Sequence, residues 1–82
     1  MARIEIGRHL AIDRRVCGGR LTFKGSRILV SDVLELLLEG FTPEKISHEY
    51  HGLITPEAVR EAETLRRKGI VREVLPKAKT AA

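Results

Sequence analysis

Apolar and polar residues alternate over short stretches of the first thirty positions, in the way that short β-strands require. Ile4 and Ile6 alternate with charged residues before Gly7, and residues 21–24 alternate again with β-forming side chains at three positions. A glycine and a serine then break the pattern. We expect one or two small strands, or a hairpin, ahead of the helical part of the chain.

The periodicity becomes helical at Ser31, which we predict to cap the N-terminus of a first helix. Asp32 follows in the first turn, where the helix dipole favours an anion, and Gly40 ends the helix. The predicted buried stripe of this helix consists of Val33, Leu34, Leu37 and Leu38.

The motif Thr-Pro-Glu occurs twice, at residues 42–44 and 55–57, and each copy is typical of a helix start. Threonine caps the helix, proline takes its first position and glutamate its first turn. The second helix is expected to end before Gly52, and the third at Gly69. The side chains expected to fill the angle between these helices are Ile46, Tyr50, Leu53, Val59, Ala62 and Leu65.

This order of elements predicts a mainly α fold, a three-helix helix-turn-helix bundle preceded by a short N-terminal β segment or hairpin. We expect a single domain over residues 1–75, in which the β segment covers 1–30 and the three-helix unit 31–68. A C-terminal element covers 70–75, and a disordered tail covers 76–82.

The charge is distributed unevenly along the 82 residues, whose 15 basic and 11 acidic side chains give a net charge of +4. Residues 1–30 carry seven basic and two acidic side chains, residues 31–57 one and six, and residues 58–82 seven and three. Two basic ends therefore flank an acidic middle, which indicates a polyanion-facing side and a separate surface for another partner.

Candidate chemistry is sparse. Cys17 is the single cysteine and has no visible partner base, so it predicts neither a disulfide nor a nucleophile. His48 and His51 lack convergent third and fourth ligands for a metal. We expect no metal, no cofactor and no enzymatic activity. With no signal peptide and no membrane-length apolar run, we expect a cytoplasmic location.

The third helix would be the recognition helix of a helix-turn-helix, and only Arg60 near its start has the character of a base reader. Glu57 and Glu61 beside it would repel phosphates. An alternative interpretation is a solvated helix face with ion pairs such as Glu63–Arg67. The basic side chains predicted to contact DNA are Arg27, Arg60, Arg66, Arg67 and Lys68.

Three segments occur in an order that is characteristic of one family: GGRLTFKGSRILVSDVL at 18–34, GFTPEKI at 40–46 and LITPEAVREA at 53–62. Together they resemble the bacterial domain-of-unknown-function family four-three-three, whose members are described as VapB-like antitoxins. The resemblance covers about residues 9–68. The chain departs from the family's usual residues at Leu21, Leu29 and His51, which replace prolines, and at Ser26, which replaces threonine.

The resemblance implies a homeodomain-like three-helix unit and the role of the antitoxin in a toxin–antitoxin pair, with repression of the shared operon as a further role. The implied partner is a PIN-like ribonuclease toxin, which holds metal ions among clustered carboxylates. A basic, partly apolar segment suits such an acidic pocket, because Arg and Lys pair with carboxylates. The side chains predicted to bind the toxin are Ile70, Val71, Arg72, Val74, Leu75 and Lys77.

We also expect a homodimer, because one small module makes too few contacts for specific DNA binding. Exposed N-terminal strands could pair across a two-fold axis. Two alternatives stay open. One is a protein-interaction module without DNA binding, favoured by the acidic middle and the Glu-rich third helix, and the other is a stand-alone small DNA-binding regulator.

Overall fold

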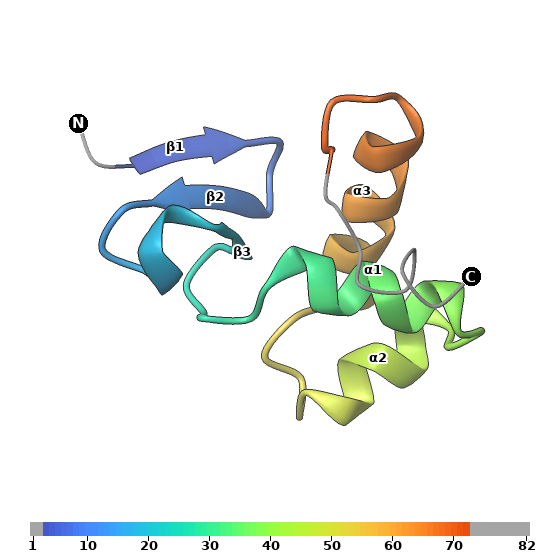
Figure 1. The fold of residues 1–82 in the computed structure, drawn as a ribbon. Coiled ribbons are helices and arrows are strands. Elements are labelled where there is room, and N and C mark those ends of the chain that lie inside the picture. The colour runs from blue at the N-terminus through green and yellow to red at the C-terminus, as the bar shows by residue number, and fades with distance from the viewer. Residues whose placement is uncertain (1–2, 73–82) are drawn as a thin grey trace, which may run out of the picture.

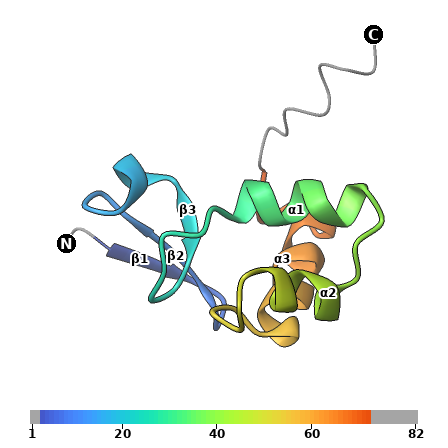
Figure 2. The same cartoon turned by 90° about the horizontal axis from the view of Figure 1, so that it is seen from below.

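A computed structural model describes residues 3–72 of the chain, as a three-stranded antiparallel sheet beside three helices (Figures 1 and 2). The strands follow the order β1-β2-β3 in the sheet, so each strand neighbours the next one along the chain. The elements are β1 (Arg3–Ile6), β2 (Leu10–Asp13), the short 3-10 helix η1 (Cys17–Gly19), β3 (Leu21–Phe23), α1 (Val30–Leu38), α2 (Pro43–Glu49) and α3 (Pro56–Arg67).

The sheet is a full structural layer, so the prediction of a mainly α, homeodomain-like bundle with a minor β segment is wrong. The register places Leu10 opposite Phe23 and Ile12 opposite Leu21, which aligns apolar side chains on one face of the sheet. Leu10 and Phe23 are among the most buried residues and pack in the same core as the helices. The described chain is therefore a small mixed α/β domain.

The core is contributed by every layer of this domain. Val33 and Leu34 of the predicted stripe are buried, whereas Leu38 is 48% exposed. The largest fully buried side chains are Phe23, Leu10, Leu34, Ile46, Val30, Val33 and Val59.

Both Thr-Pro-Glu motifs begin helices as predicted. The Thr42 hydroxyl accepts a hydrogen bond from the Lys45 N–H, and the Thr55 hydroxyl accepts one from the Ala58 N–H, each at 3.1 Å. Each cap satisfies one backbone donor that the first helical turn leaves without a partner. These two helix starts are therefore determined by three consecutive residues.

The predicted cap of α1 is wrong. Leu29 occupies the N-cap position, because a bridge to Thr22 holds its backbone extended and the helix begins at the next residue. Ser31 is consequently buried inside the first turn, where its hydroxyl oxygen accepts a hydrogen bond from Arg20 at 3.3 Å. The sheet thus determines where α1 begins.

The turn between α2 and α3 also differs from the prediction. Leu53 is 70% exposed, and the core position belongs instead to Ile54, which is 3% exposed. The backbone of His51 has a φ of +57°, which the spacing of apolar residues does not predict. The Ser47 hydroxyl donates to the Ile54 carbonyl oxygen at 2.7 Å and so holds Ile54 against α2.

One carboxylate joins the β1–β2 hairpin to α3. Glu61 accepts hydrogen bonds from the backbone N–H groups of Arg8 and His9, at 2.9 and 2.8 Å, and contacts the His9 ring Nδ1 at 3.0 Å. These donors lie in the turn between β1 and β2, which Figure 1 shows beside α3. Gly7 completes the turn with a φ of +66°.

A substitution at Gly7 tests how closely the β1–β2 turn approaches α3. A Cβ atom added there would lie 2.7 Å from Glu61 Oε2, and the positive φ would be strained as well. We expect Gly7→Ala to lower the free energy of unfolding by about 2–4 kcal/mol, the sum of the backbone strain and weakened hydrogen bonds to the carboxylate. Urea unfolding followed by circular dichroism measures the loss.

Gly25→Ala is the matched control, because Gly25 has a φ of +76° but no atom within 4 Å of the added Cβ. It should show the backbone strain alone, about 1–2 kcal/mol. Equal losses in the two variants would contradict a close approach of the turn to Glu61.

Candidate functional site

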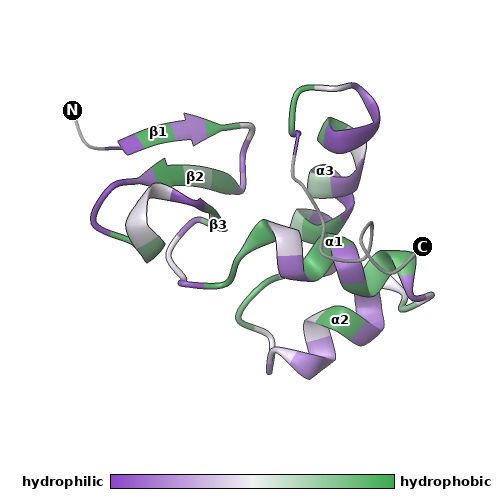
Figure 3. Cartoon of the chain, in the orientation of Figure 1, coloured by the Kyte–Doolittle hydropathy of each residue, from purple (hydrophilic) through white to green (hydrophobic). Residues whose placement is uncertain are grey.

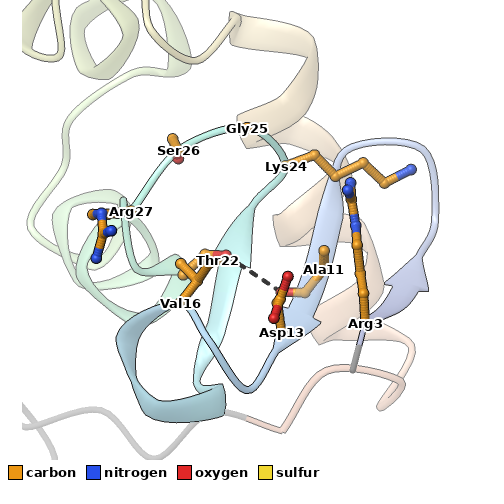
Figure 4. Close-up of a pocket in the computed structure, with 9 residues that line it drawn as sticks. All are labelled: Arg3, Ala11, Asp13, Val16, Thr22, Lys24, Gly25, Ser26 and Arg27. Atoms are coloured by element: carbon orange, nitrogen blue, oxygen red, sulfur yellow. Dashed lines mark hydrogen bonds between the residues drawn. The ribbon is translucent and has the colours of Figure 1, made fainter. Parts of the chain in front are cut away.

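The outer face of the sheet, opposite the core, carries a hollow of about 290 Å³ that we call the outer hollow (Figure 4). Its floor contains Ala11 and Thr22, each 3% exposed, which alternate along β2 and β3 with the core side chains. Arg3, Lys24 and Arg27 stand around it, from β1 and from the loop that follows β3. The alternation of each strand thus leaves apolar side chains inward and a partly basic hollow outward.

The hydroxyl groups of the outer hollow are already used in holding its backbone. Thr22 donates to the Ala11 carbonyl oxygen at 3.4 Å. Ser26 donates to the Phe23 carbonyl oxygen at 2.9 Å and accepts from the Ile28 N–H at 3.1 Å. These groups shape the hollow and are not poised as nucleophiles.

The charges of the outer hollow are partly paired. Glu5 lies 3.5 Å from Arg3 and 3.2 Å from Lys24, so one carboxylate serves two cations. Hydrogen bonds from the backbone and the side chain of Arg15 lower the pKa of Asp13, which favours its carboxylate form. The hollow can bind a polar or anionic group, but the carboxyl group of Asp13, which lines it, is not adapted to donate a proton at neutral pH.

The first half of α3, predicted to read bases, is occupied by contacts within the chain. Arg60 forms an ion pair with Glu44 of α2. The pKa of Glu44 is lowered by a hydrogen bond from its own backbone N–H and then by Arg60. Glu61, from the same half of the helix, holds the hairpin turn. Base reading by Arg60 stays a prediction, and it would require breaking this ion pair.

The other predicted DNA contacts fall in two separate places. Arg66, Arg67 and Lys68 are exposed at the last turn of α3, which we call the basic end of α3, and Figure 3 colours this turn as hydrophilic. Arg67 forms the predicted pair with Glu63 at 3.2 Å. Arg27 lies instead at the outer hollow, in the loop before α1. The structure therefore does not gather the five predicted side chains onto one surface.

The predicted toxin-binding segment begins in the described part of the chain and continues beyond it. Ile70 is 59% exposed, and the Arg72 side chain donates to the Gly69 carbonyl oxygen at 3.3 Å. Val71, in contrast, is 4% exposed and packs in the core, so toxin binding by Val71 stays a prediction and would require this side chain to leave the core. Val74, Leu75 and Lys77 lie outside the described residues, as do the end of the predicted 70–75 element and the predicted 76–82 tail.

The structural role of Glu61 is the feature that sequence reasoning missed. His9 and Arg8, whose backbone N–H groups donate to Glu61, are 52 and 53 positions away along the chain. No local motif reports a contact of that separation, because helix patterns show neighbours only three or four residues apart. The sequence shows only an acidic residue in the third helix and a Gly-containing turn near the N-terminus, and nothing in it joins the two.

The described part of the chain, residues 3–72, has neither a cluster of metal-ligating side chains nor a membrane-spanning helix. Within that range, no three His, Cys, Asp or Glu side chains come together as possible metal ligands. Among the same residues, no helix is long and apolar enough to cross a membrane. Cys17 lies at a φ of +50°, and its thiol donates to the Arg27 carbonyl oxygen at 3.5 Å.

The fold and its surfaces define a small α/β domain whose distinctive features are exposed basic and apolar groups. The chain belongs to the family "Protein of unknown function (DUF433)", whose sequence model matches residues 10–63. The resemblance seen in the sequence is thereby confirmed as to family. The match begins at the first residue of β2 and ends inside α3, so β1 and the basic end of α3 lie outside it. No curated protein and no solved structure matches the chain.

Glu61 predicts how the stability depends on pH. Partial burial raises its pKa, but hydrogen bonds from Arg8 and His9 outweigh this effect, so the pKa is lowered from its ordinary 4.5. Between the folded-state pKa and pH 4.5, the folded chain therefore binds fewer protons than the unfolded chain. The stabilisation is complete above pH 4.5 and is lost as the pH falls through the folded-state pKa.

Glu61→Gln removes this titration and one of the strong acceptors. We expect it to lower the free energy of unfolding at neutral pH by about 1–3 kcal/mol and to flatten the decline at acid pH. Urea unfolding at a series of pH values measures both effects. Glu57→Gln, one turn earlier on α3 and exposed, is the control. The same flattening in the control would contradict the assignment to Glu61.

Proposed function

We propose that the protein is the antitoxin of a toxin–antitoxin pair and binds a PIN-like ribonuclease through the basic end of α3 and the segment that follows it. The observation that carries the proposal is the juxtaposition of Arg66, Arg67 and Lys68 with the 59%-exposed Ile70. Exposed cations beside an exposed aliphatic side chain form a surface suited to an acidic partner with an apolar rim.

The chemistry of the partner explains why this surface would inhibit it. A ribonuclease that holds metal ions among carboxylates presents a negative pocket, and guanidinium groups pair with carboxylates in bidentate geometry. Arg72 and Lys77 follow Ile70 along the chain and extend the same charge. A basic segment seated there would compete with the metal and with RNA for the pocket.

Buried Val71 gives the segment a defined starting point. The chain after α3 turns back, because the Ile70 and Val71 N–H groups both donate to the Leu65 carbonyl oxygen, at 2.9 and 3.1 Å. With Val71 held in the core, Ile70 faces away from the core at the exit of the domain. The domain then acts as an anchor for the residues that contact the toxin.

Ile70→Asp tests the proposed surface. Placing a negative charge at the centre of a contact with an acidic pocket should weaken inhibition of the ribonuclease by about tenfold or more. The measurement is RNA cleavage by a candidate PIN-like ribonuclease, titrated with the wild-type or the variant protein.

Leu53→Asp is the matched control, since Leu53 is another exposed aliphatic side chain, in the turn before α3. It should inhibit as well as the wild type. Full inhibition by Ile70→Asp, equal loss in the control, or no inhibition by the wild type would each contradict the proposal.

A second candidate is binding of operator DNA, which the exposure of Arg66 and Lys68 favours because both side chains can reach phosphates. If they do, replacing both by Ala should weaken binding to the gene's own upstream DNA. The slope of log affinity against log salt should decrease by about 2, one unit for each phosphate contact. A gel-shift titration at several salt concentrations measures it, and an unchanged slope would exclude this placement.

A further inference from the structure

We propose that β1 is a self-pairing edge, and that two copies of the chain join β1 to β1 in antiparallel orientation to make one continuous six-stranded sheet. Among residues 3–72, the strand order leaves β1 with a single neighbour, β2. At the other edge, β3 is bridged to Leu29, so its backbone is partly engaged. Figure 1 shows β1 at the outer side of the sheet, with its C-terminal end leading into the turn beside α3.

The occupant of this edge follows from the order of side chains in β1. In the sequence Arg3-Ile4-Glu5, charges of opposite sign flank a central aliphatic residue. A two-fold axis through Ile4 sets Ile4 opposite Ile4 of the second copy. By the same symmetry, Arg3 of each copy lies opposite Glu5 of the other copy. Opposite charges and matching aliphatic residues are the cross-strand pairs that stabilise antiparallel sheets.

Neighbouring registers are disfavoured by the same rule. An axis through Glu5 or through Arg3 would place like charges directly opposite each other, which destabilises a strand pair. An axis between Ile4 and Glu5 would set an aliphatic side chain against a carboxylate and turn the helices of the two copies to opposite faces. Among these registers, only the one centred on Ile4 places an aliphatic residue opposite an aliphatic residue and each charged residue opposite one of the other sign.

The burial of β1 also fits a strand that is completed by a second copy. Ile4 lies opposite Ile12 and so belongs to the core face of the sheet, yet it is 60% exposed. Pairing would cover it with its symmetry mate. Glu5 is 58% exposed, and its two oxygens lie 3.2 Å from Lys24 and 3.5 Å from Arg3 of the same chain, so pairing would exchange the Arg3–Glu5 contact within each chain for one between the two copies. An isologous contact of this kind closes after two copies.

β1 lies outside residues 10–63, the part of the chain that matches the family. The proposed pairing therefore concerns this chain's own N-terminal strand. It is also independent of the toxin surface, because it uses no residue of the basic end of α3. Its failure or success leaves the proposed function untouched.

Charge reversal tests the register with the full-length chain. R3E and E5R should each weaken the dimer about tenfold or more, because each places like charges opposite each other at both ends of the strand pair. Mixing the two variants should restore the dimer, since every charged pair is then opposite in sign. Sedimentation velocity of each protein and of the mixture measures the association, with circular dichroism to verify the fold.

Leu53→Lys is the control, because it changes an exposed aliphatic side chain far from β1 in the sequence and should dimerise like the wild type. A wild-type chain that stays at its monomer mass of 9.2 kDa at every concentration would overturn the proposal. So would a dimer that R3E and E5R leave intact, or variants whose mixture dimerises no better than either alone.

Discussion

The carboxylate of Glu61 is the interaction on which the arrangement of the sheet and the helices depends. It accepts from two successive backbone N–H groups of the β1–β2 turn, which would otherwise have to find their partners in water. A charged acceptor makes stronger hydrogen bonds than a neutral one. Because the turn is held to α3, the hairpin has a defined position relative to the helices. Gly7 permits the approach, since a side chain there would occupy the space of the carboxylate.

Sequence reasoning succeeded where the determining groups are close together along the chain. The starts of α2 and α3 each depend on a threonine and a backbone N–H three residues later, so Thr42 and Thr55 were predictable. Ser31 has the same local character, yet it caps nothing, because the bridge between Leu29 and Thr22 moves the helix start. The prediction of a mainly α fold was wrong because it, too, depended on contacts between residues that are distant along the chain. The alternation predicted short strands, but their share of the core is visible only once their register is known.

The candidate surfaces were predictable in composition but not in position. The basic end of α3 follows directly from consecutive cations at the end of a helix. The distribution of the remaining charge does not, because Arg60 turns to Glu44 on a different helix. Val71 shows the limit most clearly, since the same apolar residue can be a free anchor or part of the core. Only the path of the chain after α3, which doubles back onto Leu65, decides between the two.

The two proposed surfaces are compatible because they are on different elements. β1 lies at the outer side of the sheet, whereas the basic end of α3 is the C-terminal end of that helix (Figure 1). Joining two copies at β1 would leave both basic ends uncovered, so one dimer could hold two toxin molecules. If the toxins themselves associate, the second contact becomes intramolecular and the effective affinity rises without any new interaction. The Glu61 contact would then matter for more than stability, because it holds the sheet proposed to pair against the helix proposed to bind.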